Sequence, residues 1–297
     1  FESLDHQLQY SISNFVSNDK SVKNCVFAVA KGDGSFYWSG AAGIADVKSQ
    51  NPMTKETPFF VASITKLFTA SAIMILYEKG KLNLDEPISK YLPEKLIKGI
   101  NAFEGKDYSR AITIRHLLSH TSGIADYYSD RPKGGKNLFE IMMSNPERDW
   151  SVEETITRAR TDLNPHFVPG AETSYSDTNY QLLGKIIEKI TGKHLHDVFN
   201  DLFLKPLGLK HTWLIRRSKP AVFLTILPAD VYFKDTLITK TRYNKAYWAD
   251  GGIVSTVEDC IIFLKALKEG RIIKPETLAL MHQWRKLHFL SLIHISE

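Results

Sequence analysis

The pattern of apolar and polar residues divides the start of the chain into a helix, two strands and a second helix. Residues 2–17 have the spacing of an amphipathic helix. Short apolar runs at 25–31 and 35–43 flank Gly32-Asp33-Gly34, which predicts a β-hairpin. The most apolar run, 67–77, is too short to span a membrane and predicts a buried central helix.

Beyond this helix the pattern predicts a helix-rich middle followed by more strands. The chain is helical and loop-rich to about residue 210, with 83–93 and 131–146 as connecting loops. From 221 to 243 the β-branched and aromatic content rises, which indicates strands, and the period at 260–267 indicates a helix.

These elements predict an α/β fold of two lobes. Residues 1–62 and 221–289 would form an α/β lobe, and residues 63–220 a mostly helical lobe inserted between its halves. We expect an antiparallel sheet flanked by helices, with the functional cleft between the lobes. No internal repeat or low-complexity tract is present in the sequence.

The most informative chemical pattern is Ser63-Ile64-Thr65-Lys66, at the start of the central helix. Residues three apart lie on one face of a helix, so the amine of Lys66 can reach the hydroxyl of Ser63. A serine hydroxyl needs an adjacent base to attack an acyl group at neutral pH, and a desolvated lysine can be that base. The pattern alone also fits a helix N-cap serine followed by a surface lysine.

A second S-x-x-K sequence shows how little the letters alone establish. Ser17-Asn18-Asp19-Lys20 has the same spacing but lies in a polar segment without a following apolar helix. We interpret that copy as a solvated loop. Further motifs are therefore needed to interpret Ser63.

Three more segments supply them, in this order: His116-Leu117-Leu118-Ser119-His120-Thr121-Ser122-Gly123, then Tyr175-Ser176-Asp177-Thr178-Asn179-Tyr180 after Pro169-Gly170, then Gly251-Gly252-Ile253-Val254-Ser255-Thr256 with Asp259. Together with Ser63 and Lys66, the set resembles the serine β-lactamase-related family of class C β-lactamases, D-Ala-D-Ala carboxypeptidases and related esterases. The resemblance extends from about residue 26 to about residue 281. It implies a β-lactamase/DD-peptidase-like fold.

Carried over to this chain, the resemblance implies a catalytic group of three residues. Ser63 would be the acylated nucleophile, Lys66 its proton acceptor, and Tyr175 the second acid/base residue. A nearby lysine cation favours the phenolate of a tyrosine, so Lys66 and Tyr175 could pass a proton between them. Tyr175 would equally fit a buried aromatic residue that caps the helix expected near Thr178.

Asp177 departs from the Y-x-N pattern that is common in this family. An asparagine amide donates and accepts hydrogen bonds, whereas an ionised aspartate only accepts them. We expect Asp177 to lie in the substrate-binding region and its charge to disfavour anionic β-lactams. Peptidase-like and esterase-like relatives accommodate such variation more readily.

The family's third motif, K-x-G or H-x-G on a strand, is expected after Gly251-Gly252 and is not found. Lys268-Glu269-Gly270 has the letters, but it ends an apolar-periodic helix, with Gly270 as the expected C-cap. Residues 290–297 resemble the translation of a transposon-type sequencing adapter, although an ordinary amphipathic tail is the alternative. The expectation is that the natural chain continues after about Phe289 and that the fragment is nearly inactive.

Composition limits the partners. The 297 residues carry 38 Lys and Arg against 33 Asp and Glu, a net charge of +5 spread along the chain, which predicts no nucleic-acid surface.

His116 and His120 are four apart on an expected helix, but no third ligand accompanies them, so we predict structural histidines and neither metal nor cofactor. Cys25 and Cys260 suit buried free thiols and do not indicate a compartment. A periplasmic or extracellular location is expected, with an export signal removed or not captured in this sequence.

Two classes of function follow. In the first, the protein is a serine hydrolase that forms a covalent acyl-enzyme with D-amino-acid peptides, β-lactams or small esters, possible substrates including peptidoglycan-derived material. In the second, it is a non-catalytic cell-wall or penicillin-binding module of the same fold. Asp177 and the missing third motif keep the second class open, whereas Ser63, Lys66 and Tyr175 together favour the first.

Overall fold

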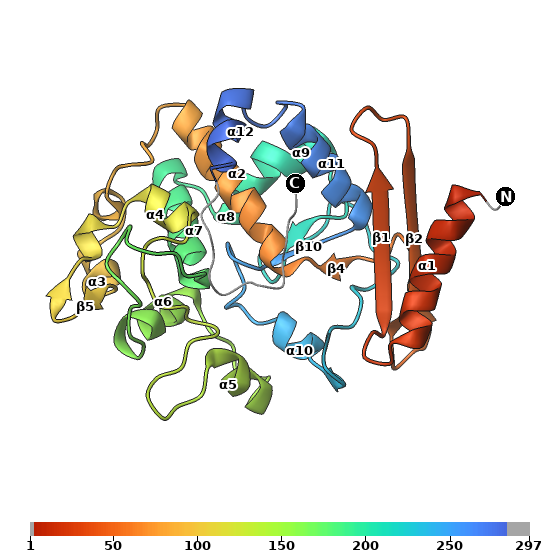
Figure 1. Cartoon of the computed structure of the whole chain (residues 1–297), viewed down its shortest axis with the longest axis horizontal. Helices are drawn as coiled ribbons and strands as arrows, with labels where there is room; N and C mark the ends of the chain where they lie inside the picture. The colour runs from red at the N-terminus through yellow and green to blue at the C-terminus, as the bar shows by residue number, and fades with distance from the viewer. Residues whose placement is uncertain (1–2, 284–297) are drawn as a thin grey trace.

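The computed structural model describes residues 3–283, and its N-terminal part is a helix packed on a small antiparallel sheet (Figure 1). Helix α1, Leu4–Asn18, lies against strand β2, Tyr37–Asp46. Strand β1, Asn24–Ala30, pairs with β2, and β3, Asn51–Pro52, extends the sheet in the order β1-β2-β3. The predicted N-terminal helix and hairpin are confirmed, with their ends displaced by a few residues.

A second antiparallel sheet joins the segment before Ser63 to residues far along the chain. Its order is β4 (Phe59–Phe60), β10 (Ile253–Ser255) and β7 (Trp213–Leu214). Helix α11, Val257–Lys268, follows β10 and contacts β1. Segments from both ends of the described chain therefore meet around the start of the central helix. The predicted boundaries of the two lobes stay a prediction.

The central helix α2, Thr65–Glu78, is apolar on nearly all sides and buried, as the sequence predicted. A 3₁₀ turn, Ala62–Ile64, leads into it and carries Ser63. On one side the ring of Phe68 stacks on Phe263 of α11 at a centroid distance of 3.8 Å. This packing fixes the position of the helix start.

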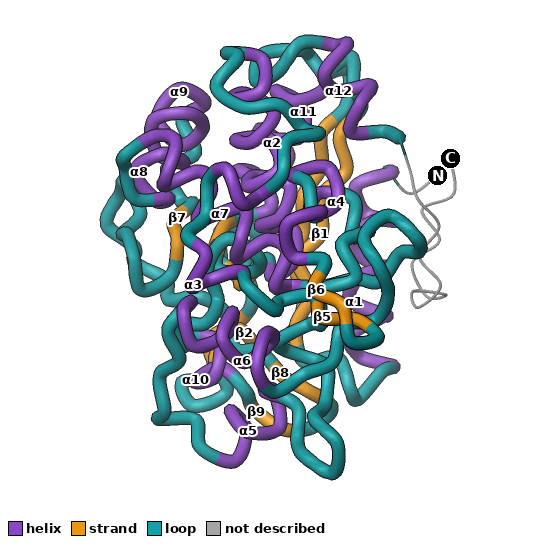
Figure 2. The backbone as a smooth tube through the Cα atoms, turned by 90° about the vertical axis from the view of Figure 1, so that its left-hand side faces the viewer, coloured by secondary structure: helices purple, strands orange, loops and turns teal. Residues whose placement is uncertain are grey.

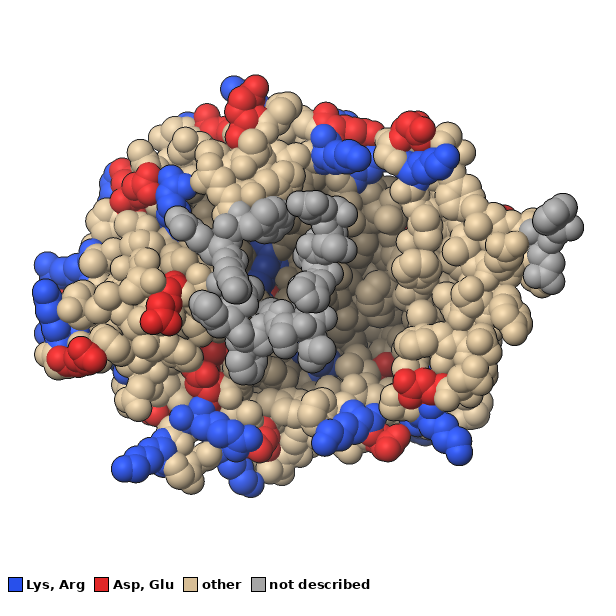
Figure 3. Space-filling model, in the orientation of Figure 1, with Lys and Arg blue, Asp and Glu red and all other residues tan. Residues whose placement is uncertain are grey.

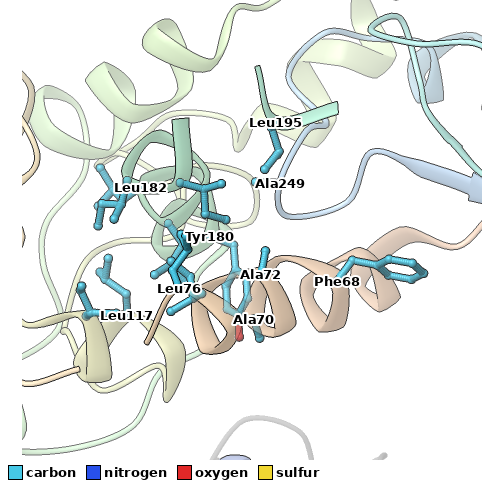
Figure 4. Close-up of a cluster of buried hydrophobic side chains, with 14 of the residues drawn as sticks. Phe68, Ala70, Ala72, Leu76, Leu117, Tyr180, Leu182, Leu195 and Ala249 are labelled. Atoms are coloured by element: carbon cyan, nitrogen blue, oxygen red, sulfur yellow. The ribbon is translucent and has the colours of Figure 1, made fainter. Parts of the chain in front are cut away.

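The longest helix of the middle region, α7 (Asp177–Thr191), packs against α2 and α4 (Ile114–Leu118). Figure 4 shows Leu76 of α2, Tyr180 and Leu182 of α7 and Leu117 of α4 in one buried cluster. The residues that begin α2 and α7 are thereby held close together.

Shorter elements and long loops complete the chain (Figure 2). They are α3 (Glu94–Ile97), β5 (Ala102–Phe103), β6 (Lys106–Asp107), α5 (Leu138–Ser144), α6 (Val152–Thr161), α8 (Leu195–Phe199), α9 (Lys205–Leu207), β8 (Tyr232–Phe233), β9 (Thr236–Leu237), α10 (Thr239–Arg242) and α12 (Pro275–Met281). A π-helical segment, Asn200–Leu204, joins α8 to α9. Within residues 3–283, no helix has both the length and the apolar character needed to cross a bilayer.

Two sequence interpretations were wrong. Residues 221–243 form mostly loop, with only the short β8–β9 hairpin and α10. Some of their apolar side chains are buried, such as those of Ala229 and Ile238, but others face solvent, and Phe223 is 93% exposed. Isolated backbone hydrogen bonds, such as that from the amide of Ala229 to the carbonyl of Pro58, hold this segment against the sheets. The loop expected at 131–146 contains α5, whose Asn137 and Glu140 form a capping box that the sequence interpretation missed.

Gly184, inside α7, generates a prediction about stability. A Cβ atom at this position would lie 2.6 Å from the Cβ of Ala249 and 2.6 Å from the ring of Trp248. Alanine favours a helix over glycine by about 1 kcal/mol, but Gly184→Ala should still lower the free energy of unfolding by roughly 1–3 kcal/mol through overpacking. Urea denaturation measures the change.

Lys189→Ala is the matched control, because Lys189 is an exposed residue of the same helix. Its effect should stay within about 0.5 kcal/mol. An unchanged or raised free energy of unfolding for Gly184→Ala would show that α7 can move away from Trp248 and Ala249.

Candidate active site

Ser63 lies in a strained turn between strand β4 and helix α2. The preceding residue, Ala62, has φ +49°, a left-handed conformation that residues with a side chain seldom adopt. The amide of Val61 donates to the carbonyl of Ile253 at 3.1 Å, which ties the turn to β10. Strain at this point is sustained by the surrounding sheet, and it turns the chain directly before Ser63.

The structure brings together the three residues that the sequence proposed as catalytic. The hydroxyl oxygens of Ser63 and Tyr175 are 2.6 Å apart, and the amine of Lys66 donates to Ser63 Oγ at 3.2 Å. The same amine lies 4.8 Å from the ring centroid of Tyr175. A serine hydroxyl in contact with two titratable groups is the arrangement that nucleophilic catalysis requires.

All three hydrogen-bond donors of Lys66 have acceptors. Besides Ser63, the amine donates to Asp177 Oδ1 at 2.5 Å and to the carbonyl oxygen of Asp250 at 2.8 Å. Burial favours the neutral amine, but the negative charges nearby, first that of Asp177, outweigh it and raise the pKa of Lys66 above its usual range. Lys66 is therefore an ammonium in this arrangement.

The pKa of Tyr175 is also raised, which the sequence interpretation did not expect. Burial and the charge of Asp177 raise its pKa to about 12, although Lys66 and the hydrogen bond with Ser63 act in the opposite direction. Lys66 does favour the phenolate, as the sequence interpretation expected, but burial and then the charge of Asp177 outweigh its effect on the pKa of Tyr175. In the resting site both groups carry their protons at neutral pH.

Asp177, expected in the substrate-binding region, is the first residue of α7 and lies against Lys66. Its carboxylate pairs with Lys66 and its side chain is 15% exposed. Its backbone amide donates to Asp126 Oδ1 at 3.0 Å, which fixes the start of the helix. Contact between Asp177 and a substrate stays a prediction.

The sequence interpretation missed two buried carboxyl groups around this ion pair, those of Asp126 and Asp250. Asp250 accepts a hydrogen bond from the hydroxyl of Tyr127 at 2.5 Å and one from the amide of Trp248 at 3.0 Å. Burial and the charge of Asp177 raise the pKa of both carboxyl groups. Its position directly before Gly251-Gly252, a motif of the resemblance, was the sequence signal that could have identified Asp250.

Position 252, which follows the loop that carries Asp250, has no room for a side chain. A Cβ atom there would lie 2.8 Å from the carbonyl oxygens of both Tyr247 and Trp248. A side chain would displace the loop that presents the Asp250 carbonyl to Lys66. Close packing of the backbone therefore requires glycine at position 252, whereas a Cβ atom at Gly251 would lie no closer than 3.8 Å to its neighbours.

His116 and His120 were expected on one helix, and the structure shows that they are not. Helix α4 ends at Leu118, and His120 lies beyond it with φ +57°. His116 belongs to the capping box of α4, where its Nδ1 accepts from the amide of Thr113 at 3.2 Å. Across residues 3–283, no group of three or more His, Cys, Asp or Glu side chains is arranged to hold a metal ion.

The third motif has no counterpart near Ser63 among residues 3–283. Lys268-Glu269-Gly270 ends helix α11, and Gly270 has φ +73°, as predicted for a helix end. The adapter-like residues 290–297 lie outside the described part of the chain.

Figure 3 shows that the molecular face is hollowed beside the β1–β2 hairpin, with charges of both signs around the rim.

Comparison with known proteins identifies the family. The family model described as Beta-lactamase matches residues 17–290. The chain belongs to the β-lactamase family. The resemblance noted in the sequence is thus confirmed.

Individual members of the β-lactamase family resemble this chain over most of its length. The mouse (Mus musculus) protein "Serine beta-lactamase-like protein LACTB, mitochondrial" is 28% identical over 84% of this chain. The chain spans only 57% of that protein. Esterase EstB of Burkholderia gladioli is 31% identical over 85% of this chain and 67% of its own length.

Among solved structures, the D-amino acid amidase of Ochrobactrum anthropi SV3 in complex with D-phenylalanine superposes with a TM-score of 0.73. It is 26% identical, and the match covers 93% of this chain and 74% of the amidase. The predicted fold class, an α/β fold of the β-lactamase/DD-peptidase type with antiparallel sheets and flanking helices, is confirmed.

Proposed function

We propose that the protein is a serine hydrolase that forms an acyl-enzyme at Ser63 and acts on small esters and amides. The observation that carries this proposal is the 2.6 Å contact between the hydroxyls of Ser63 and Tyr175, with Lys66 donating to Ser63 Oγ. A purely structural serine needs only one such partner. Here two titratable groups, from helix α2 and from the loop before α7, converge on one hydroxyl.

Proton transfer in this site begins at Tyr175. Its oxygen lies closest to Ser63 Oγ, so its phenolate form accepts the serine proton as Ser63 attacks the acyl carbon. The tyrosine then returns the proton to the leaving alcohol or amine. Lys66, kept cationic by Asp177, stabilises the phenolate and the negative charge that develops beside it.

The charges around Lys66 favour neutral or cationic acyl donors. Asp177 already balances Lys66, and the carboxyl groups of Asp126 and Asp250 lie close enough to interact electrostatically with Asp177. A substrate carboxylate would approach without an unpaired lysine to receive it. The esterase and the D-amino acid amidase among the similar proteins are consistent with small esters and amino acid amides as substrates.

Labelling of Ser63 tests the proposal directly. A fluorescent fluorophosphonate should modify the full-length protein at Ser63, because the probe reacts with activated serines, and peptide mass spectrometry identifies the site. Ser63→Ala should remove the label, whereas Ser17→Ala, which changes the other S-x-x-K serine, should retain it. Label that persists in Ser63→Ala would refute the assignment, and no label on the wild type would favour the binding module.

The pH dependence tests the part played by Asp177. Since its charge raises the pKa of both Lys66 and Tyr175, Asp177→Asn lowers both, and the basic form of Tyr175 is reached at lower pH. The alkaline rise of kcat/KM for p-nitrophenyl butyrate should therefore move down by roughly one pH unit or more. Glu172→Gln, which removes an exposed carboxylate from the same loop, should leave the profile unchanged.

Substrate charge provides a second measurement on the same variant. Wild type should turn over p-nitrophenyl butyrate, a neutral ester, faster than the anionic β-lactam nitrocefin. Asp177→Asn should raise the nitrocefin rate relative to the ester rate by roughly tenfold, about 1.4 kcal/mol of lost repulsion. An unchanged ratio would mean that the substrate carboxylate does not approach Asp177, and Glu172→Gln again serves as the control.

A further inference from the structure

His120 contacts Tyr175 through both its main chain and its side chain. The carbonyl oxygen of His120 accepts from the amide of Ser174 at 2.9 Å, and its ring Nδ1 accepts from the amide of Ser176 at 3.1 Å. The residues on either side of Tyr175 are thus both bonded to one histidine. The left-handed backbone of His120 turns its carbonyl and its ring toward the same segment.

The imidazole also covers the face of the tyrosine. Its ring is stacked on that of Tyr175, with centroids 4.6 Å apart and an interplanar angle of 26°. The ring of Tyr180 lies on the same histidine at 5.3 Å. Tyr175 is therefore held by a ring contact in addition to the two backbone hydrogen bonds.

Hydrogen bonding and charge both require this histidine to be neutral. Nδ1 accepts the amide proton of Ser176, which assigns the ring proton to Nε2. Burial, and then the cation of Lys66, lower the pKa of His120 to about 3. An imidazolium would lose the bond to Ser176 and would place a second cation near Lys66.

We propose that His120 is a positioning residue that fixes the backbone and ring of Tyr175 so that its hydroxyl meets Ser63. The inference extends the proposed function, because it assigns a role to a residue that does not itself reach the nucleophile. His116, four residues earlier, caps its own helix, and within the described part of the chain it is neither hydrogen-bonded to Tyr175 nor stacked on it. It is the matched control.

Two variants separate the contributions of His120. His120→Asn keeps a side-chain acceptor for Ser176 and tolerates the left-handed backbone, but it removes the stacked ring. His120→Phe keeps a ring and removes the acceptor. Each should slow fluorophosphonate labelling of Ser63 by roughly 10- to 100-fold, because small displacements of a catalytic group have effects of this size.

A double-mutant comparison distinguishes positioning from a general loss of structure. In a Tyr175→Phe background, where no hydroxyl remains to be positioned, His120→Asn should slow labelling by less than about twofold. His116→Asn should leave labelling unchanged in both backgrounds. Losses from His120→Asn and Tyr175→Phe that multiply fully would overturn the proposal.

The ionisation of Tyr175 gives a measurement that does not depend on catalysis. NMR of tyrosine labelled with ¹³C at Cζ, assigned by comparison with Tyr175→Phe, should show Tyr175 still protonated in wild type at pH 10.5. In His120→Asn, removal of the covering ring admits water, and the pKa should fall from about 12 toward its ordinary value near 10. In His120→Phe the face stays covered and Tyr175 should remain protonated.

The two kinds of failure are distinguishable. A wild-type protein that takes no label would refute the proposed hydrolase but would leave the NMR comparison intact. Tyr175 signals that titrate identically in wild type, His120→Asn and His116→Asn would overturn the positioning role, whatever the labelling shows. Thermal unfolding of each variant identifies any that fail to fold. If His120→Asn does not fold, the labelling rate of His120→Phe is compared with that of the wild type instead.

Discussion

The buried ammonium of Lys66 is the constraint on which the site depends. Removing a cation from water is unfavourable unless every donor finds an acceptor and an opposite charge lies near. Lys66 meets this condition with three partners from separate parts of the chain: the hydroxyl of Ser63, the carboxylate of Asp177 and the carbonyl of Asp250. The turn before α2, the start of α7 and the loop before β10 must therefore converge on one atom.

The rest of the fold sustains that convergence. Strand β10 pairs with β4 directly before the nucleophile turn, and the backbone at Gly252 packs too closely for any side chain. Helix α7 is held against α2 by apolar contacts along its length, which leaves its first residue, Asp177, at the level of Lys66. Rigid elements on both sides allow the strained backbone at Ala62 to persist.

The sequence predicted the family, the fold class and the proximity of Ser63, Lys66 and Tyr175, because these depend on local motifs and on periodicity. It did not predict the protonation balance, since the net effect on Tyr175 depends on how closely Asp177 approaches Lys66 and on burial by residues remote in sequence. Asp250 escaped notice for a similar reason: its backbone carbonyl, which any residue type could supply, contacts Lys66. Only the short β8–β9 hairpin forms where strands were expected at 221–243, because composition favours strands only where they pair and pack on a half-buried surface.

The distances along the chain between site residues have a consequence for synthesis. Ser63 and Tyr175 are separated by 112 positions, and Lys66 and the Asp250 carbonyl by 184. Contacts this remote close late, because a long loop must be ordered before either end gains from it. As the chain leaves the ribosome, helix α2 emerges long before its partners. Tyr175 cannot reach Ser63 until more than 100 further residues have been made, and until residue 250 has followed, the amine of Lys66 lacks one of its three acceptors.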